Sequence, residues 1–142
     1  MLKNLVLSLR TYADMSPDLG LRRQIARTWH TRANLTGEAW WGSFPPSSMV
    51  AKEVAMFVYA QMTDYSGLPF AKVLPSDRLE ADLHLSEVCW FDWQTSLCDD
   101  FARQFGVDIS LNFDPDALNT VEDLVIFLDR QLGAVNYSSA EH

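Results

Sequence analysis

The side chains able to carry chemistry in this chain are mostly carboxylates, so the first question is whether two of them could work as an acid–base pair. Residues 49–142 contain sixteen Asp and Glu side chains. Asp99 and Asp100 are adjacent, but neighbouring residues of a helix point about 100° apart, so these two carboxylates would face different sides. The other acids show no paired spacing, and we interpret the whole set as a solvated acidic face.

Histidine, the usual general base near neutral pH, occurs at His30, His84 and His142. These positions are far apart, and no serine-histidine-acid order, glycine-rich phosphate loop or zinc-ligand spacing accompanies them. His84 follows Asp82 closely, which favours a hydrogen-bonded structural role. The sequence therefore predicts neither an enzyme nor a metal site.

Cys89 and Cys98 lie nine positions apart in a segment predicted to be helical. A helix would place their Cα atoms well beyond the roughly 7 Å limit for a disulfide, so we expect reduced thiols packed as small hydrophobes. No apolar run approaches the roughly 20 residues of a membrane span, and the amino terminus has no cleavage signature. We therefore expect a cytoplasmic protein without a membrane partner.

Charge divides the chain into two parts of opposite sign. Residues 1–48 carry six Lys and Arg against three acids, whereas residues 49–142 carry five against sixteen. The acidic part would repel nucleic acids and anionic membranes and attract a basic protein surface. The basic cluster is expected either to be a solvated helix face or to dock on the acidic part; it consists of Arg22, Arg23, Arg27 and Arg32.

Apolar periodicity predicts the elements that would position these residues. Residues 1–48 form a basic extension, with helices over 2–12 and from Ser16–Pro17 onward, followed by a Trp/Pro-rich linker. The stripe of the second helix comprises Leu19, Leu21, Ile25 and Trp29. Residues 49–134 form the main domain, and 135–142 a frayed tail.

In the main domain we predict a helix ended by Gly67, a long loop, a helix from Ser86 to Phe105, and a last helix capped by Thr120 with Asp123 in the reciprocal position. The loop is expected to tuck Leu68, Phe70, Val73, Leu74, Leu79 and Leu83 onto the helices. No convincing strand is present, so the fold class is all-α.

Three motifs in this domain resemble acyl carrier proteins. "LPSDRLEADLHL" is similar to the loop that leads to the family's modified serine, "FARQFGVDIS" to the end of its second helix, and "NTVEDLVIFLDRQL" to its closing helix. The resemblance implies an acyl-carrier-protein-like four-helix bundle, here with an N-terminal helical extension. The chain also resembles a group of short bacterial carrier-like proteins of unassigned function.

The family's functional serine has no direct counterpart. Counting back from Phe105 by the family's spacing gives Phe91, whose ring has no hydroxyl for a phosphodiester. Ser86 is the nearest hydroxyl on the loop side, and it is a candidate for 4'-phosphopantetheine attachment or, without any chemistry, for a helix cap. Trp90 and Trp93 are expected to pack against the extension near Trp29, Trp40 or Trp41, or else to anchor a partner.

The leading hypothesis is a non-catalytic, carrier-like interaction module without phosphopantetheine. Its partner would be a protein with a basic surface, bound through Trp90, Asp92, Trp93, Asp99 and Asp100. Two alternatives stay open: a genuine carrier modified on Ser86, and an acidic immunity or inhibitor protein that neutralises a toxin or enzyme. The sequence leaves the oligomeric state undetermined.

Overall fold

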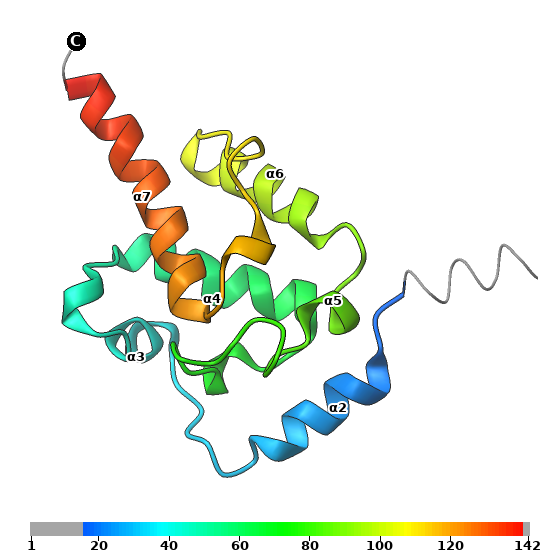
Figure 1. The fold of residues 1–142 in the computed structure, drawn as a ribbon. Helices are drawn as coiled ribbons and strands as arrows, with labels where there is room; N and C mark the ends of the chain where they lie inside the picture. Colours follow the sequence, from blue (N-terminus) through cyan, green and yellow to red (C-terminus); the bar gives the residue numbers. More distant parts are fainter. Residues whose placement is uncertain (1–15, 141–142) are drawn as a thin grey trace, which may run out of the picture.

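Helices make up the regular structure of the chain, as expected for an all-α protein (Figure 1). The computed structural model describes residues 16–140, with side chains to residue 133, so the helix expected over residues 2–12 lies outside the described residues. Within 16–140 no residue belongs to a strand, and one isolated antiparallel bridge joins Arg78 to Thr120. The α-helices are α2 (Leu19–Thr28), α3 (Gly37–Gly42), α4 (Lys52–Ser66), α5 (Leu85–Val88), α6 (Trp93–Phe105) and α7 (Val121–Ala140). Short 3-10 helices are η1 (Pro46–Ser48), η2 (Phe70–Lys72) and η3 (Pro115–Ala117).

Helix α4 lies at the centre, and α3, α7 and η2 all pack against it. It buries Val54, Ala55, Phe57, Val58 and Met62 at helical spacing. The helix ends as predicted at Gly67, whose φ of +67° is left-handed. This backbone conformation favours glycine, and a Cβ here would also lie 2.6 Å from the Arg22 guanidinium, which would have to shift.

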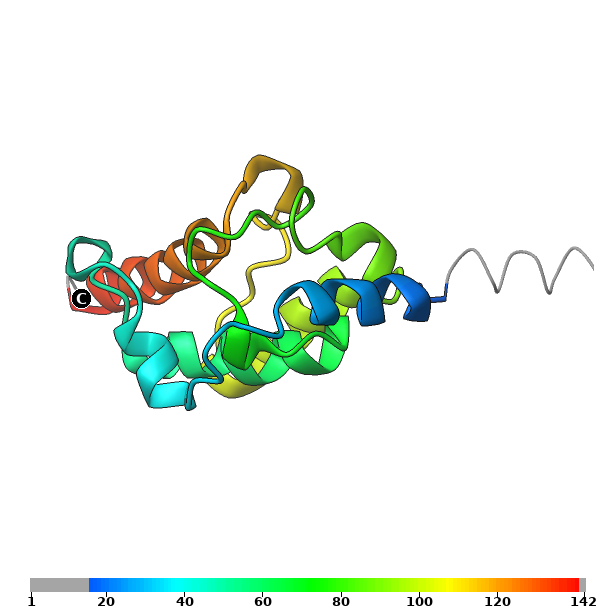
Figure 2. The same ribbon diagram turned by 90° about the horizontal axis from the view of Figure 1, so that it is seen from below.

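Helix α2 lies across the outside of the other helices and contacts α5 (Figures 1 and 2). Its N-terminal cap is Asp18, whose carboxylate accepts the Leu21 amide at 3.0 Å, so the helix begins slightly later than Ser16–Pro17 had indicated. Ile25 and Trp29 are buried as predicted, but Leu19, in the first turn of the helix, is exposed.

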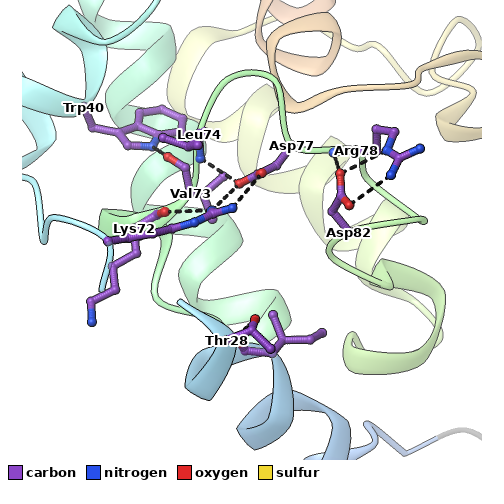
Figure 3. A network of polar contacts seen from close by, with 10 residues as sticks. Thr28, Trp40, Lys72, Val73, Leu74, Asp77, Arg78 and Asp82 are labelled. Atoms are coloured by element: carbon purple, nitrogen blue, oxygen red, sulfur yellow. Dashed lines mark hydrogen bonds and ion pairs between the residues drawn. The ribbon is translucent and has the colours of Figure 1, made fainter. Parts of the chain in front are cut away.

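The tryptophan-rich segment interpreted as a linker is helical and contributes to the core. Trp40 of α3 is fully buried and donates its indole N–H to the Val73 carbonyl at 2.9 Å (Figure 3). Trp41 donates in the same way to the Val50 carbonyl at 2.8 Å. These two bonds satisfy the polar atoms of large apolar rings, which allows the segment to bury them.

The long loop between α4 and α5 is anchored by its own side chains. Five of the six residues predicted to tuck inward are buried, namely Leu68, Phe70, Val73, Leu79 and Leu83. The prediction for Leu74 was wrong, because this side chain is exposed while its amide donates to the Asp77 carboxylate at 2.8 Å. That carboxylate also binds Arg32, which ties the loop to the segment after α2.

Helix α7 begins with the predicted capping box. The Asp123 amide donates to the Thr120 hydroxyl oxygen at 3.1 Å, and the Thr120 amide donates to the Asp123 carboxylate at 3.1 Å. The backbone remains helical to Ala140, including residues 135–140 of the expected frayed tail. No helix in the described part of the chain combines the length and apolar character needed to cross a bilayer.

Candidate functional site

The single helix predicted from Ser86 to Phe105 is wrong: α5 ends at Val88, and α6 begins at Trp93. The break has a tertiary cause. The Glu87 carbonyl accepts the Asp18 amide at 2.9 Å, and the Val88 carbonyl accepts the Arg22 Nε at 2.8 Å. A continuing helix would use these same carbonyls for its own hydrogen bonds, so donors from the start of α2 replace those bonds and end the helix.

Ser86 lies in the first turn of α5 and does not cap it, which corrects that part of the sequence interpretation. His84 precedes the helix with a φ of +53°, and its side chain makes no capping bond. The Ser86 hydroxyl instead donates to Glu80 Oε2 at 2.7 Å, and the Ser86 amide donates to Glu80 Oε1 at 2.9 Å. Ser86 therefore donates one hydrogen bond to each oxygen of the Glu80 carboxylate.

The aromatic residues around the break divide into buried and exposed. Trp93 is buried, and its ring lies edge-on to Phe113 with 6.2 Å between the centroids. Its aromatic neighbour therefore lies in the loop after α6 and not, as expected, in the N-terminal extension. Trp90 and Phe91 are exposed to 43% and 63%. Two adjacent large rings on a protein surface are uncommon and typical of binding sites.

A groove of about 530 Å³ opens beside these rings. Its walls come from the loop before α5, from α5 and the break, from the start of α6, and from η3 with the residues after it. The lining residues are Leu79, Glu80, Ala81, Leu85, Ser86, Trp90, Phe91, Trp93, Gln94, Pro115, Asp116, Leu118 and Asn119. The described residues that line it include two acids and no Lys, Arg or His.

The acidic residues predicted to bind a partner are in different states. Asp92 and Asp99 are exposed. Asp100 is half-buried, accepts the Tyr65 hydroxyl, and pairs with Arg103 at 3.1 Å, so it has partners within the chain. Burial, together with the hydrogen bond to Asp100, raises the pKa of the Tyr65 hydroxyl above its ordinary value.

The two cysteines are free and buried, in agreement with the sequence prediction. Burial raises the pKa of the Cys89 thiol to about 12 and also raises the pKa of Cys98. His84 was expected to be near Asp82 in a structural role, but the Asp82 carboxylate pairs with Arg78 (Figure 3). Among the described residues, no three His, Cys, Asp or Glu side chains gather as metal ligands would.

Sequence reasoning identified Ser86, Trp90, Phe91 and Trp93 but not that they line one groove. It missed Glu80, and it missed Asp116 of η3 and Leu118 just after η3. Asp116 and Leu118 lie far from Trp90 in sequence, and Glu80 was considered only as part of a loop motif, so only their positions in space reveal that they share a groove.

The chain matches no protein-family model, no curated protein and no solved structure in the comparisons made. The geometry of the site therefore has to support any functional proposal by itself.

Proposed function

We propose that this chain is a non-catalytic, carrier-like interaction module that binds a protein partner with a basic surface. The observation that carries the proposal is the exposed pair Trp90 and Phe91 at the edge of a groove lined by acids and no bases. Exposed aromatic rings contribute large binding energies when a partner covers them, and surrounding carboxylates attract basic partners.

The order of elements supports the carrier-like part of the proposal. Helix α4 is followed by a long loop, then α5 and α6, a short 3-10 helix and the closing helix α7. This order agrees with the expected helix, long loop, helix, short segment and helix, except that α5 and α6 replace the single helix expected from Ser86 to Phe105. Phe91 lies two residues before α6, and the family's spacing from Phe105 assigns it the serine position, so on this proposal an apolar ring replaces the attachment hydroxyl.

A carrier modified on Ser86 is the second candidate, and one observation favours it: the Ser86 hydroxyl is exposed and lies in the groove. Its bond to Glu80 places a negative carboxylate beside the oxygen that would attack a phosphate-bearing donor. The family's spacing assigns the serine position to Phe91 and not to Ser86, so we favour the unmodified module.

Intact mass spectrometry of the protein from its native host separates the two candidates. The proposal expects the mass of the unmodified chain, before and after incubation with a broad-specificity pantetheine transferase and coenzyme A. A gain equal to one phosphopantetheine group, lost in Ser86→Ala, would establish the carrier instead.

Partner binding is tested by site-specific photo-crosslinking in the native host. A photoreactive phenylalanine analogue replaces Phe91 in one variant and Leu111, exposed to 96% but outside the groove lining, in the matched control. We expect one discrete protein adduct from position 91 and none from position 111. Replacing Asp92 and Asp99 with lysine should reduce the yield of the position-91 adduct about tenfold, because a basic partner would then be repelled and associate more slowly. Equal adducts at both positions, or a yield insensitive to charge reversal, would contradict the proposal.

A further inference from the structure

We infer that the groove beside Trp90 binds a linear basic segment of the partner, which inserts a bulky apolar side chain and places an arginine or lysine against Glu80 and Asp116. This inference rests on the proposed function and specifies the chemistry of the partner.

The groove is suited to an apolar side chain. Leu79, Leu85 and Trp93 are buried beneath it, and Leu118 is half-buried at its wall. Its volume of about 530 Å³ lies within the range of roughly 300–1,000 Å³ typical of ligand pockets. Phe91, exposed to 63%, also lines the groove, so its ring would add contact area to an inserted side chain.

The walls are preformed, because backbone hydrogen bonds join the segments that build them. The Leu79 amide donates to the Asn119 carbonyl at 2.9 Å, and the Leu85 amide donates to the Leu79 carbonyl at 3.1 Å. The loop before α5, α5 itself and the residues after η3 are therefore held together. A preformed groove costs little ordering free energy when a segment binds.

Charge specifies the rest of the segment. Glu80 and Asp116 line the groove, and Glu87 and Asp92 are exposed on the same α5–α6 region. The two bonds from Ser86 orient the Glu80 carboxylate. A fixed carboxylate suits the planar fork of arginine, which donates two parallel hydrogen bonds. An acidic or uncharged segment would gain nothing from these groups.

The test begins with a displayed library of short random peptides selected on the full chain. Enriched peptides are synthesised with a fluorophore, and their Kd is measured by fluorescence polarisation. We expect a shared pattern of one bulky apolar residue with arginine or lysine nearby. Phe91→Ala and the double variant Glu80→Gln/Asp116→Asn should each weaken binding by about tenfold or more.

Matched controls are Leu111→Ala and Asp64→Asn, which remove an exposed apolar and an exposed acidic side chain outside the groove lining. Both should leave Kd within about twofold, since surface changes away from a site have small effects. Far-ultraviolet circular dichroism and urea unfolding confirm that all variants fold.

Several outcomes would overturn the inference: no enrichment, an acidic or uncharged consensus, or equal weakening by groove and control variants. The inference would also be overturned if a synthetic peptide of residues 1–15 bound the groove more tightly than any selected peptide. The groove would then bind a segment of its own chain and not a partner. A selected sequence that acts by joining two copies, detected by sedimentation, would overturn it as well. A cellular adduct at Phe91 without a basic peptide consensus would leave the proposed function standing and reject the groove inference alone.

Discussion

Arg32 and Asp77 form a two-point ion pair across 45 positions of sequence, with Nη1–Oδ2 at 2.7 Å and Nη2–Oδ1 at 3.1 Å. The same guanidinium donates to the Lys72 carbonyl at 3.1 Å, and the Asp77 carbonyl accepts the Val121 amide at 2.9 Å. One contact thus joins the segment after α2, the long loop and the start of α7. The basic extension and the acidic domain meet here through specific geometry as well as net charge.

Asp77→Ala should lower the free energy of unfolding by about 3 kcal/mol, because it leaves a partly buried guanidinium and the Leu74 amide without their acceptor. Urea unfolding measures the change. Arg103→Ala, which breaks a pair whose arginine is 78% exposed, is the control and should cost less than about 1 kcal/mol. If both variants lost the same free energy of unfolding, the buried Arg32–Asp77 pair would stabilise the fold no more than the exposed pair does.

Trp40→Phe should destabilise the chain by about 2–3 kcal/mol, since it leaves the Val73 carbonyl unsatisfied and opens space in the core. Thermal and urea unfolding measure the loss. Phe91→Ala, which removes an exposed ring, should change stability by no more than about 0.5 kcal/mol. A stable Trp40→Phe protein would argue that α3 is peripheral to the core.

Thr120→Ala should cost about 1 kcal/mol, because the Asp123 amide loses its capping acceptor. Ser86→Ala removes a hydroxyl of similar type that caps no helix, so its effect on stability should stay within about 0.5 kcal/mol. The comparison is made by urea unfolding of the two variants in parallel. If Ser86→Ala were the more costly change, the geometry of the Glu80 contact would need revision.

Thiol reactivity should report the burial of both cysteines. Because only the thiolate is nucleophilic and burial raises the pKa of Cys89 to about 12, almost none is reactive at pH 8. We expect a chromogenic disulfide reagent to react at least about 100-fold more slowly with the folded chain than with the chain in denaturant. Two equivalents should react after unfolding, and a fast native reaction would contradict the buried positions.

Tyr65 should make the fold sensitive to alkaline pH. Its folded pKa lies above the ordinary value of 10.0, so the folded state favours the protonated hydroxyl. The resulting stabilisation is complete below pH 10 and is lost as the pH rises above it. Tyr65→Phe should therefore show a shallower loss of stability between about pH 9.5 and 11 than the parent chain. Urea unfolding across this range measures both slopes, and identical slopes would exclude the effect.

Local sequence signals predicted those parts of the fold that depend on neighbouring residues. The end of α4 at Gly67 follows from the tolerance of glycine for positive φ, and the start of α7 follows from the Thr120–Asp123 capping pair. On α6, Leu97 and Phe101 are both buried and lie four positions apart, which is the spacing of one helix face. In each case the residues that decide the structure lie within about one helical turn, so a local pattern contains the information.

Local patterns could not decide which tryptophans are buried in the core and which are exposed at the surface. Trp40, Trp90 and Trp93 are identical side chains, yet the first is fully buried and the second is 43% exposed. The buried tryptophans have distant partners of different kinds, the Val73 carbonyl for Trp40 and the Phe113 ring for Trp93. Neither partner can be identified from spacing.

The sequence by itself determined that the chain is helical, where its best-capped helices begin and end, and that its charge is divided between two regions. Only the tertiary structure decided that the predicted helix breaks between Val88 and Trp93 and that a groove forms there. The reason is competition for backbone acceptors: Asp18 and Arg22, distant in sequence, bond the Glu87 and Val88 carbonyls that a continuous helix would have used. Trp90 and Phe91 lie within this break and line the groove.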